Sequence, residues 1–367
     1  MARKGAKSIR RIAVNTGGGD APGLNAVIRA VTLSALNNGW EVLGIKHGYR
    51  GLIDTREVIE LNRERVHGIT SMGGTILGTA NKGSPFNFPV QTKKGLVEKD
   101  ISDLVVKNYH KLGIDALVAI GGDGSLRIAE KLSEKGMVIV GVPKTIDNDL
   151  SMTVITFGFD TAVTTATEAI DKLHTTAQAH DRVMVVELMG RYAGWIALNS
   201  GVSADAHVII IPEIPFDIDK ICKFIRDRER KGSHYSMVVC AEGAKPKGGG
   251  LMTLGEREAG REVRLGGIGQ MLEAEISKRT GKEARLMVLG HLQRGGSPTT
   301  FDRLVALRFG DAAIRFLKEG KTNVMVALDP PTVKAVPIKD AISTMKSVPL
   351  DCDTMLTARS LGICFGD

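Results

Sequence analysis

Aromatic side chains are scarce in this sequence: phenylalanine, tryptophan and tyrosine together make up 4% of its 367 residues. Proteins that bind single-stranded nucleic acid stack the bases on aromatic side chains, so this class of partner is not expected. The formal net charge of +8 nevertheless favours anionic partners. Because arginine and lysine residues lie beside glycine-rich turns, we expect phosphorylated small molecules rather than nucleic acid.

Cysteine is also infrequent, and no apolar stretch reaches the length that spans a membrane. The four cysteines lack the spacings of a metal site, and we interpret them as reduced thiols of a cytoplasmic protein. They are Cys222, Cys240, Cys352 and Cys364. The basic N-terminus is not followed by the apolar segment of a secretory signal. The sequence therefore predicts cytoplasmic localisation and no membrane partner, with Cys240 in the core.

Glycine is abundant, with 43 residues, and many glycines follow short apolar runs. These runs are almost continuously apolar, which is typical of parallel strands covered on both faces. They span residues 11–16, 42–47, 116–120, 138–142, 183–188, 208–211, 237–240 and 285–289. Helical patterns occupy residues 23–38, 101–111, 125–135 and 160–177, the last with Asp160 as the expected N-cap. This alternation predicts a doubly wound α/β fold, in one or two copies.

One glycine cluster, Gly-Gly-Asp-Gly-Ser at residues 121–125, lies between a strand-like run and a helical pattern. Glycine lets the backbone approach a ligand, and the first N–H groups of a helix attract phosphate. The carboxylate of Asp123 suits Mg²⁺, which prefers oxygen ligands and bridges substrate phosphates. The alternative is a tight turn in which small residues fit.

A second glycine-rich turn, residues 16–25, ends the first strand and opens the first helix. This is the position of a nucleotide-phosphate loop, although Pro22 stands where the dinucleotide-binding fingerprint has glycine. Residues 78–84 resemble a Walker A loop, but Ser84 occupies the lysine position and we reject that assignment. A simpler phosphate-contacting loop that includes Lys82 stays open as an alternative.

Three further clusters follow strand-like runs. Residues 143–149 combine two carboxylates with a lysine and a hydroxyl, a set that suits phosphoryl transfer or, alternatively, a simple Asx turn. Residues 189–194 contain Arg191, which can reach a phosphoryl group through two hydrogen bonds. Residues 289–298 place His291 and Arg294 beside glycines, which suits a sugar phosphate.

Together these clusters resemble the phosphofructokinases, in the family's order and over roughly residues 11–311. The motifs are GGDAPGLN at 18–25, GGDGS at 121–125, TIDND at 145–149, MGR at 189–191 and GHLQRGG at 290–296. The resemblance implies two Rossmann-like, three-layer α/β/α lobes with mainly parallel sheets and the active site in the cleft between them. It also implies a glycolytic kinase that phosphorylates fructose 6-phosphate at its 1-hydroxyl, using ATP and Mg²⁺.

The resemblance also implies lobe boundaries and residue roles. Residues 1–158 with about 293–343 would bind the donor and Mg²⁺, and residues 159–292 with about 344–367 would bind fructose 6-phosphate. Asp147 would be the general base, with Arg191 and Thr145 stabilising charge in the transition state. The donor residues implied are Gly19, Asp123 (also the metal ligand), Gly124, Ser125, Lys144 and Lys82. The acceptor residues implied are Thr145, Asp147, Asp149, Met189, Gly190, Arg191, Glu242, His291 and Arg294, with Arg182 and Arg285 from a neighbouring subunit of a homodimer or homotetramer.

Two positions bear on the identity of the phosphoryl donor, and they resemble different branches of the family. Gly124 leaves room for the α-phosphate of ATP, whereas family members that use pyrophosphate commonly carry aspartate there. Lys144 is typical of the pyrophosphate users, but the pair of Gly124 and Lys144 occurs in a mixed branch of the phosphofructokinase A type that includes ATP users. We therefore expect ATP, and keep a reversible pyrophosphate-dependent reaction as the alternative.

Four positions depart from the bacterial ATP enzymes. Asn81 replaces an arginine that touches the donor, where Lys82 can compensate, and Ile128 replaces a small residue near the adenine. Leu33 and His207 replace a basic and an acidic residue of the family's effector site. Regulation by ADP or phosphoenolpyruvate is therefore not expected.

Three other interpretations compete with this one. A kinase of another substrate, such as NAD or a lipid, would share the Gly-Gly-Asp-Gly turn. The MGR and HLQR clusters argue against it, because they supply contacts to a sugar phosphate. A noncatalytic regulatory subunit that binds phosphosugars would have lost Asp147 or Asp123, and both are present. A dehydrogenase would need a G-x-G-x-x-G turn. The glycine-rich residues 242–267 are a candidate substrate-side lid or, alternatively, a tolerated insertion.

Overall fold

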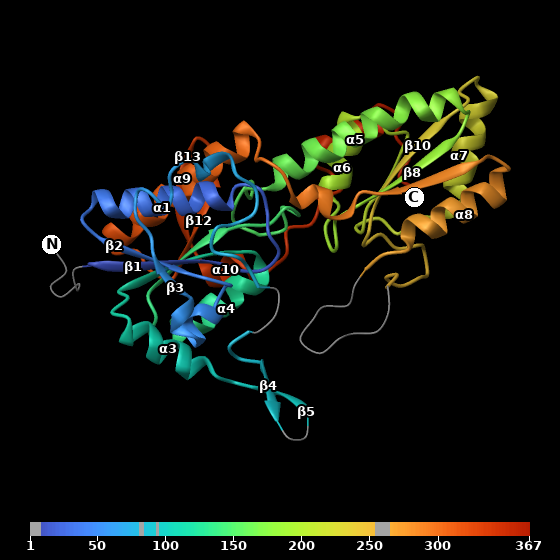
Figure 1. The fold of residues 1–367 in the computed structure, drawn as a ribbon. Coiled ribbons are helices and arrows are strands. Elements are labelled where there is room, and N and C mark those ends of the chain that lie inside the picture. Colours follow the sequence, from blue (N-terminus) through green and yellow to red (C-terminus); the bar gives the residue numbers. More distant parts are fainter. Residues whose placement is uncertain (1–8, 81–83, 93–94, 254–264) are drawn as a thin grey trace. The chain divides into compact units, whose positions relative to one another are not determined.

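The computed structural model describes residues 9–80, 84–92, 95–253 and 265–367, and the chain forms two compact units (Figure 1). The first unit comprises Met1–Thr145, Leu150–Gly158 and Arg294–Met345. The second comprises Ile146–Asp149, Phe159–Gln293 and Lys346–Asp367. Each unit therefore contains segments that are far apart in the sequence.

The first unit is built on a sheet that is parallel at its centre. Within the described residues its strand order is β13-β12-β7-β6-β1-β2-β3. The strands are β1 (Arg11–Thr16), β2 (Glu41–Ile45), β3 (Val58–Glu60), β6 (Ala116–Gly121), β7 (Ile139–Pro143), β12 (Val324–Asp329) and β13 (Thr332–Pro337). Only β3 and β13, at the two edges, pair antiparallel with their neighbours among these strands.

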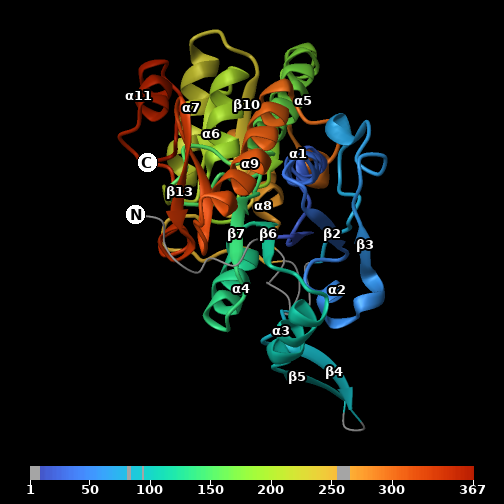
Figure 2. The ribbon, with the colours of Figure 1, turned by 90° about the vertical axis from the view of Figure 1, so that its left-hand side faces the viewer.

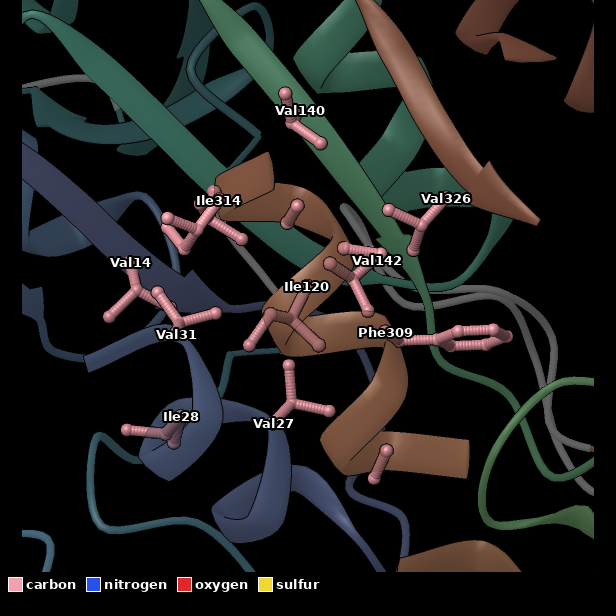
Figure 3. Packing of buried hydrophobic residues seen from close by; sticks show 14 of the residues in the cluster. Val14, Val27, Ile28, Val31, Ile120, Val140, Val142, Phe309, Ile314 and Val326 are labelled. Carbon is pink, nitrogen blue, oxygen red and sulfur yellow. The ribbon is translucent and has the colours of Figure 1, made fainter. Parts of the chain in front are cut away.

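Helices cover both faces of this sheet, which explains why its central strands are apolar at almost every position. Helices α1 (Leu24–Asn37) and α9 (Thr300–Lys318) pack against each other on one face (Figure 2). Figure 3 shows Val27 of α1 and Phe309 of α9 in one buried cluster with Ile120 of β6. A second buried cluster joins the other face to the remaining helices of the unit. These are α2 (Arg50–Ile53), α3 (Ser102–Lys111), α4 (Asp123–Glu134) and α10 (Ile338–Ala341).

A separate two-stranded hairpin projects beyond α3 in both views (Figures 1 and 2). It consists of β4 (Phe88–Thr92) and β5 (Gly95–Lys99), which pair antiparallel. Two single-turn helices, η1 (Thr55–Glu57) and η2 (Ile69–Ser71), flank β3 in the chain. The hairpin and the two single-turn helices lie outside the central parallel part of the sheet.

The second unit has a parallel sheet with the order β11-β8-β10-β9 in the described part of the chain. Its strands are β8 (Val183–Leu188), β9 (Val208–Ile210), β10 (Ser236–Ala241) and β11 (Ala284–Val288). Its helices are α5 (Phe159–Ala179), α6 (Trp195–Ser203), α7 (Ile218–Arg230), α8 (Ile268–Thr280) and α11 (Asp353–Ser360), and the short helix η3 spans Gly290–Arg294. All four cysteines are free, and Cys222 and Cys240 are buried in the core that α7 and α8 share with the sheet.

The expected fold class of mainly parallel α/β/α layers is confirmed. β1 and β8 have the predicted bounds, and the other predicted strands and helices agree within two residues. The prediction that Asp160 caps α5 is wrong, because the helix already includes Phe159; the carboxylate instead lies in the first turn, where it still interacts favourably with the helix dipole. None of the helices in the described ranges combines the length and apolar character needed to cross a membrane.

Candidate active site

Two glycine-rich turns of the first unit meet at the carboxyl ends of neighbouring strands. They are adjacent because β1 and β6, which precede them, pair in parallel. The N–H of Gly17 donates to the carbonyl oxygen of Ile120 at 2.9 Å. A Cβ atom added at Gly17 would lie 2.5 Å from Oγ of Ser125, so a side chain there would force the turns apart. The structure thus brings Ser125 next to the first candidate phosphate loop.

Gly19, in the turn after β1, lies beside two basic side chains. Nζ of Lys144, which directly follows β7, donates to the carbonyl oxygen of Gly19 at 2.5 Å, and Lys144 is only 4% exposed. Nη1 of Arg294 donates to the carbonyl oxygen of Asp20 at 3.1 Å. The resemblance assigns Arg294 to the sugar phosphate, but its guanidinium here lies against the glycine turn that the resemblance assigns to the donor. Two cations on a glycine turn suit an anionic ligand.

Helix α4 begins at Asp123, so that Gly124 and Ser125 occupy its first turn. The first N–H groups of a helix have no intrahelical acceptor and attract anions. A Cβ atom added at Gly124 would meet no atom within 4 Å, so this position faces open space. The buried Tyr49 donates its hydroxyl hydrogen to the carbonyl oxygen of Ser125 at 3.2 Å, which holds this turn in place.

The side chain of Asp123 is partly exposed at this helix start, and Oδ2 accepts a hydrogen bond from Nε of Arg127 at 2.8 Å. Nη2 of Arg127 also donates to the carbonyl oxygen of Ile342 at 2.7 Å. No group of three or more His, Cys, Asp or Glu residues in the described ranges could hold a metal by itself. Protein-bound Mg²⁺ commonly uses one or two carboxylates and completes its shell with phosphate oxygens and water. One accessible carboxylate beside the first N–H groups of a helix fits that pattern.

Thr145 is the last residue of the first unit before the chain enters Ile146–Asp149. It is buried, and its carbonyl oxygen accepts a hydrogen bond from Oγ1 of Thr156 at 2.7 Å. A Cβ atom added at Gly122 would lie 3.9 Å from Cβ of Thr145. Thr145 therefore lies next to the Gly-Gly-Asp-Gly turn. Lys82, Asn81 and the middle of the candidate lid, residues 254–264, lie outside the described residues.

In the second unit, the segment Ile146–Asp149 carries both candidate carboxylates, Asp147 and Asp149. Asn148, between them, has a φ of 49°, in the left-handed region that asparagine adopts more readily than most residues. Its Oδ1 accepts a hydrogen bond from Nζ of Lys346 at 3.2 Å, and the backbone N–H of Lys346 donates to the carbonyl oxygen of Asp149 at 2.9 Å. A C-terminal residue therefore holds the turn that contains Asp147.

The turn after β8 meets the chain that leaves β10. The N–H of Glu242 donates to the carbonyl oxygen of Leu188 at 2.8 Å, and the N–H of Gly243 donates to that of Gly190 at 3.1 Å. A Cβ atom added at Gly243 would lie 2.0 Å from the carbonyl oxygen of Arg191, so this approach requires glycine. The structure therefore brings Gly190, Arg191 and Glu242 together at the carboxyl ends of β8 and β10.

A buried amide connects Met189 to the turn that contains His291. The N–H of Met189 donates to Oε1 of Gln293 at 3.3 Å, and Nε2 of Gln293 donates to the carbonyl oxygen of Gly290 at 3.0 Å. Gln293 is fully buried, whereas His291 is exposed. Sequence reasoning included Gln293 in a motif but did not give it a role.

Arg182 and Arg285 lie at the amino ends of β8 and β11, at the opposite end of the sheet from Met189. Nε of Arg182 and Oε2 of Glu283 are 2.7 Å apart, and Arg285 forms an ion pair with the same carboxylate. The hydrogen bond from Arg182 is the main reason why the pKa of Glu283 lies below its usual range. At about 3.3 Å per residue, the seven steps from Arg182 to Met189 span about 23 Å. A single sugar phosphate cannot contact both ends of this strand.

The two units therefore carry different chemical groups. The first presents backbone N–H groups, two cations and one accessible carboxylate, which suit a polyphosphate with its metal. The second presents the turns of Arg191, Glu242 and His291 near Met189, and a separate turn with two carboxylates held by Lys346; such groups suit a phosphorylated sugar. This combination suits phosphoryl transfer, in which positioning and charge stabilisation are the main tasks of the protein.

Three residues that contact predicted site residues were not predicted from the sequence. Arg127 lies four residues after Asp123, a spacing that favours an ion pair on a helix, but the predicted helix begins only at residue 125. Lys346 reaches Asn148 across 198 positions, and Glu283 pairs with two arginines of its own sheet. No local pattern indicates such distant contacts.

Comparisons with known proteins agree with this interpretation. The family model for phosphofructokinase matches residues 11–317. A protein from Chloroflexus aurantiacus named ATP-dependent 6-phosphofructokinase is 49% identical over 358 residues, which cover 98% of each chain. ATP-dependent 6-phosphofructokinase 2 from Clostridium perfringens is 47% identical over 363 residues, or 98% of this chain and 99% of that one.

Solved structures resemble the fold. Phosphofructokinase from Pichia pastoris matches 98% of this chain with a TM-score of 0.79 and 29% identity; this chain spans 37% of the length of that protein. A pyrophosphate-dependent phosphofructokinase from Marinobacter aquaeolei matches 97% of this chain and 92% of its own with a TM-score of 0.78, but at 20% identity it supports the fold alone. From the family model and the long, closely similar relatives together, we conclude that this chain belongs to the phosphofructokinase family.

Proposed function

We infer that this protein transfers the γ-phosphoryl group of ATP to the 1-hydroxyl of fructose 6-phosphate, forming fructose 1,6-bisphosphate and ADP in glycolysis. The observation that carries this inference is the similarity, at 46–49% identity over nearly the whole length, to proteins named ATP-dependent 6-phosphofructokinase. The first unit is the proposed donor unit, and the second is the proposed acceptor unit. The presence of both Asp147 and Asp123 argues against a noncatalytic phosphosugar-binding subunit.

On the donor side, we assign the phosphates of ATP to the turn with Gly19 and to the first turn of α4. The open space at Gly124 supports this assignment, because a nucleotide phosphate can pass where no side chain projects. Lys144 and Arg294 supply positive charge to the same turn. When bound to Asp123 and the phosphates, Mg²⁺ would neutralise charge on the transferred group. Lys82 remains a proposed donor residue outside the described ranges.

On the acceptor side, Asp147 is the proposed general base. It takes the proton from the 1-hydroxyl while the hydroxyl oxygen bonds to the γ-phosphorus, and the bond from that phosphorus to the oxygen shared with the β-phosphate breaks. Arg191 and Thr145 stabilise the charge that develops on the transferred group. The proposed sugar-phosphate ligands are Asp149, Met189, Gly190, Glu242, His291 and Arg294.

Arg182 and Arg285 are proposed to bind the 6-phosphate of a neighbouring subunit's substrate, so that the active protein is a homodimer or homotetramer. Their position supports this proposal, because about 23 Å of strand separates Arg182 from Met189 in one subunit. Glu283 pairs with both guanidinium groups at the amino ends of β8 and β11. A protein with this arrangement has no complete acceptor site as a monomer.

The second candidate function uses pyrophosphate as the donor, and the observation that favours it is the buried Lys144 on the donor loop. Lys144 contacts a backbone carbonyl next to Gly18 and does not fill the space at Gly124. A lysine there is therefore compatible with ATP, whereas an aspartate at residue 124 would place negative charge in the path of the α-phosphate.

The test compares kcat/KM for ATP and for pyrophosphate, with Mg²⁺ and saturating fructose 6-phosphate. We expect the wild type to prefer ATP, and Gly124→Asp to lower kcat/KM for ATP by about 100-fold, because facing like charges cost several kcal/mol. Gly124→Ala is the matched control for size without charge, and its effect should be small because the position is open. A wild type that prefers pyrophosphate, or a Gly124→Asp variant that uses ATP normally, would contradict the donor assignment.

A further inference from the structure

The C-terminal residues 346–348 hold two functional turns of the second unit at once. Nζ of Lys346 donates a hydrogen bond to Oδ1 of Asn148 at 3.2 Å, and the backbone N–H of Lys346 donates to the carbonyl oxygen of Asp149 at 2.9 Å. Asn148 is buried and has a left-handed backbone, a conformation that costs free energy and that these contacts help to stabilise. Lys346 therefore contacts the two residues that directly follow Asp147.

The same C-terminal residues contact the chain that follows Arg191. Nε1 of Trp195, the first residue of α6, donates to the carbonyl oxygen of Lys346 at 2.9 Å, and the ammonium of Lys346 lies 5.4 Å from the centre of the Trp195 ring. The carboxylate of Glu213 accepts hydrogen bonds from the N–H groups of Gly194 at 3.0 Å and of Val348 at 2.8 Å. The Arg191 turn and the C-terminal residues are thus fastened at two points.

We propose that Lys346 is a positioning residue for phosphoryl transfer, which holds the turn that carries Asp147 in register with the turn that carries Arg191. This inference rests on the proposed function, since it concerns the base and the charge-stabilising arginine assigned there. The C-terminal segment, which contains none of the sequence motifs, thereby has a role in positioning catalytic residues.

The chemistry of the site argues against a purely packing role for this lysine. Burial lowers the pKa of Lys346 to about 8, and the nearby Asp149 partly opposes that shift. A methionine of similar length would pack against Trp195 without the cost of burying an ammonium group. The lysine contributes what methionine cannot, a charged donor to Asn148 beside two carboxylates.

The test compares Lys346→Met and Lys346→Ala with the matched control Lys223→Met, which removes an exposed lysine from α7 of the same unit. Steady-state kinetics should show kcat reduced by about 100-fold in both Lys346 variants, because small misplacements of reacting groups cost that much. KM for ATP should stay within about twofold. Propylammonium, which supplies the missing cation, should restore at least part of kcat to Lys346→Ala and nothing to the control.

The pH profile of the wild type gives a second readout that needs no variant. Because the protonated form donates to Asn148, kcat should fall as the pH rises through about 8, where Lys346 loses its proton. Lys346→Met should lack this alkaline decline and should melt within a few degrees of the wild type.

Two results would overturn the inference: a folded Lys346→Met variant with wild-type kcat and an unchanged profile, or a lower melting temperature as its only defect. If Lys346→Met fails to fold, the wild-type profile and amine rescue of Lys346→Ala decide the question. A wild type without activity on fructose 6-phosphate would instead refute the proposed function.

Discussion

Asp147 is the residue on which the proposed chemistry most depends, because it alone is assigned the proton of the attacking hydroxyl. We predict that Asp147→Ser lowers kcat by about 1,000-fold, as loss of a general base does, while KM for fructose 6-phosphate changes little. Steady-state kinetics with ATP and Mg²⁺ measure both constants. Asp171→Ser, which alters an exposed carboxylate of α5 in the same unit, is the control and should leave turnover unchanged. Near-normal turnover in Asp147→Ser would remove Asp147 from its role.

At this scale, short motifs let the sequence predict local geometry, while the roles of the residues stay predictions. Gly124 was singled out because it lacks a side chain, and the structure has open space at that position. Lys144 was singled out as a donor residue, and its ammonium contacts the donor loop. Lys346 was missed because its contacts with Asn148 and Trp195 form only when the C-terminal segment folds back onto the second unit.

The pairing of α1 with α9 shows how one position controls the packing of two elements. A Cβ atom added at Gly310 of α9 would lie 2.7 Å from Cβ of Ala30 and 2.8 Å from the carbonyl oxygen of Val27, both on α1. We predict that Gly310→Ala destabilises the protein by about 1–3 kcal/mol, the usual cost of overpacking, because it forces the helices apart. Urea unfolding measures this change.

The control for this prediction is Gly124→Ala, which also adds a methyl group to a helical glycine but has no atom within 4 Å of the new Cβ. Alanine is favoured over glycine in helices by up to about 1 kcal/mol, so this variant should be neutral or slightly more stable. If Gly310→Ala behaves in the same way, the helices do not need glycine at their contact.

Elements with a clear period or a continuous apolar run were predictable, and others were not, for physical reasons. Helix α6 packs against α5, α11 and β9 and is buried along much of its length, so it has no polar face to reveal a helical period. Strand β13, at the edge of its sheet, has the alternating burial of a strand, but Pro330 and Pro331 precede it and Pro337 ends it, and proline is typical of loops and turns. Burial on both sides made β1 and β8 recognisable, whereas it concealed α6.

At the scale of the whole molecule, strand–helix alternation predicted the fold class but not which strands are neighbours. In the first unit β6 pairs with β1 rather than with β2, and β12 joins β7 although most of the second unit lies between them in the chain. Parallel neighbours require crossover connections, and their order depends on packing between segments that are distant in the chain. A single sequence carries no local signal for that order.

The proposed sharing of sites between subunits would belong to the assembled molecule, and it can be tested by mixing inactive variants. In a symmetric dimer, a site would combine Asp147 of one subunit with Arg182 and Arg285 of the other. Asp147→Ser and Arg285→Ala should each be inactive alone. In a mixed dimer of the two, one site carries both changes and the other carries neither, so that the second site is intact.

Random exchange of equal amounts should therefore restore about a quarter of the wild-type activity, since half of the dimers are mixed and each has one working site. The measurement is fructose 1,6-bisphosphate formation after the variants are unfolded and refolded together, with each variant refolded alone as the control. If Arg285 acted on the substrate of its own subunit, every site in the mixture would lack either the base or the arginine. Activity would then stay at the level of the separate variants, and the strand that separates Arg182 from Met189 would need another explanation.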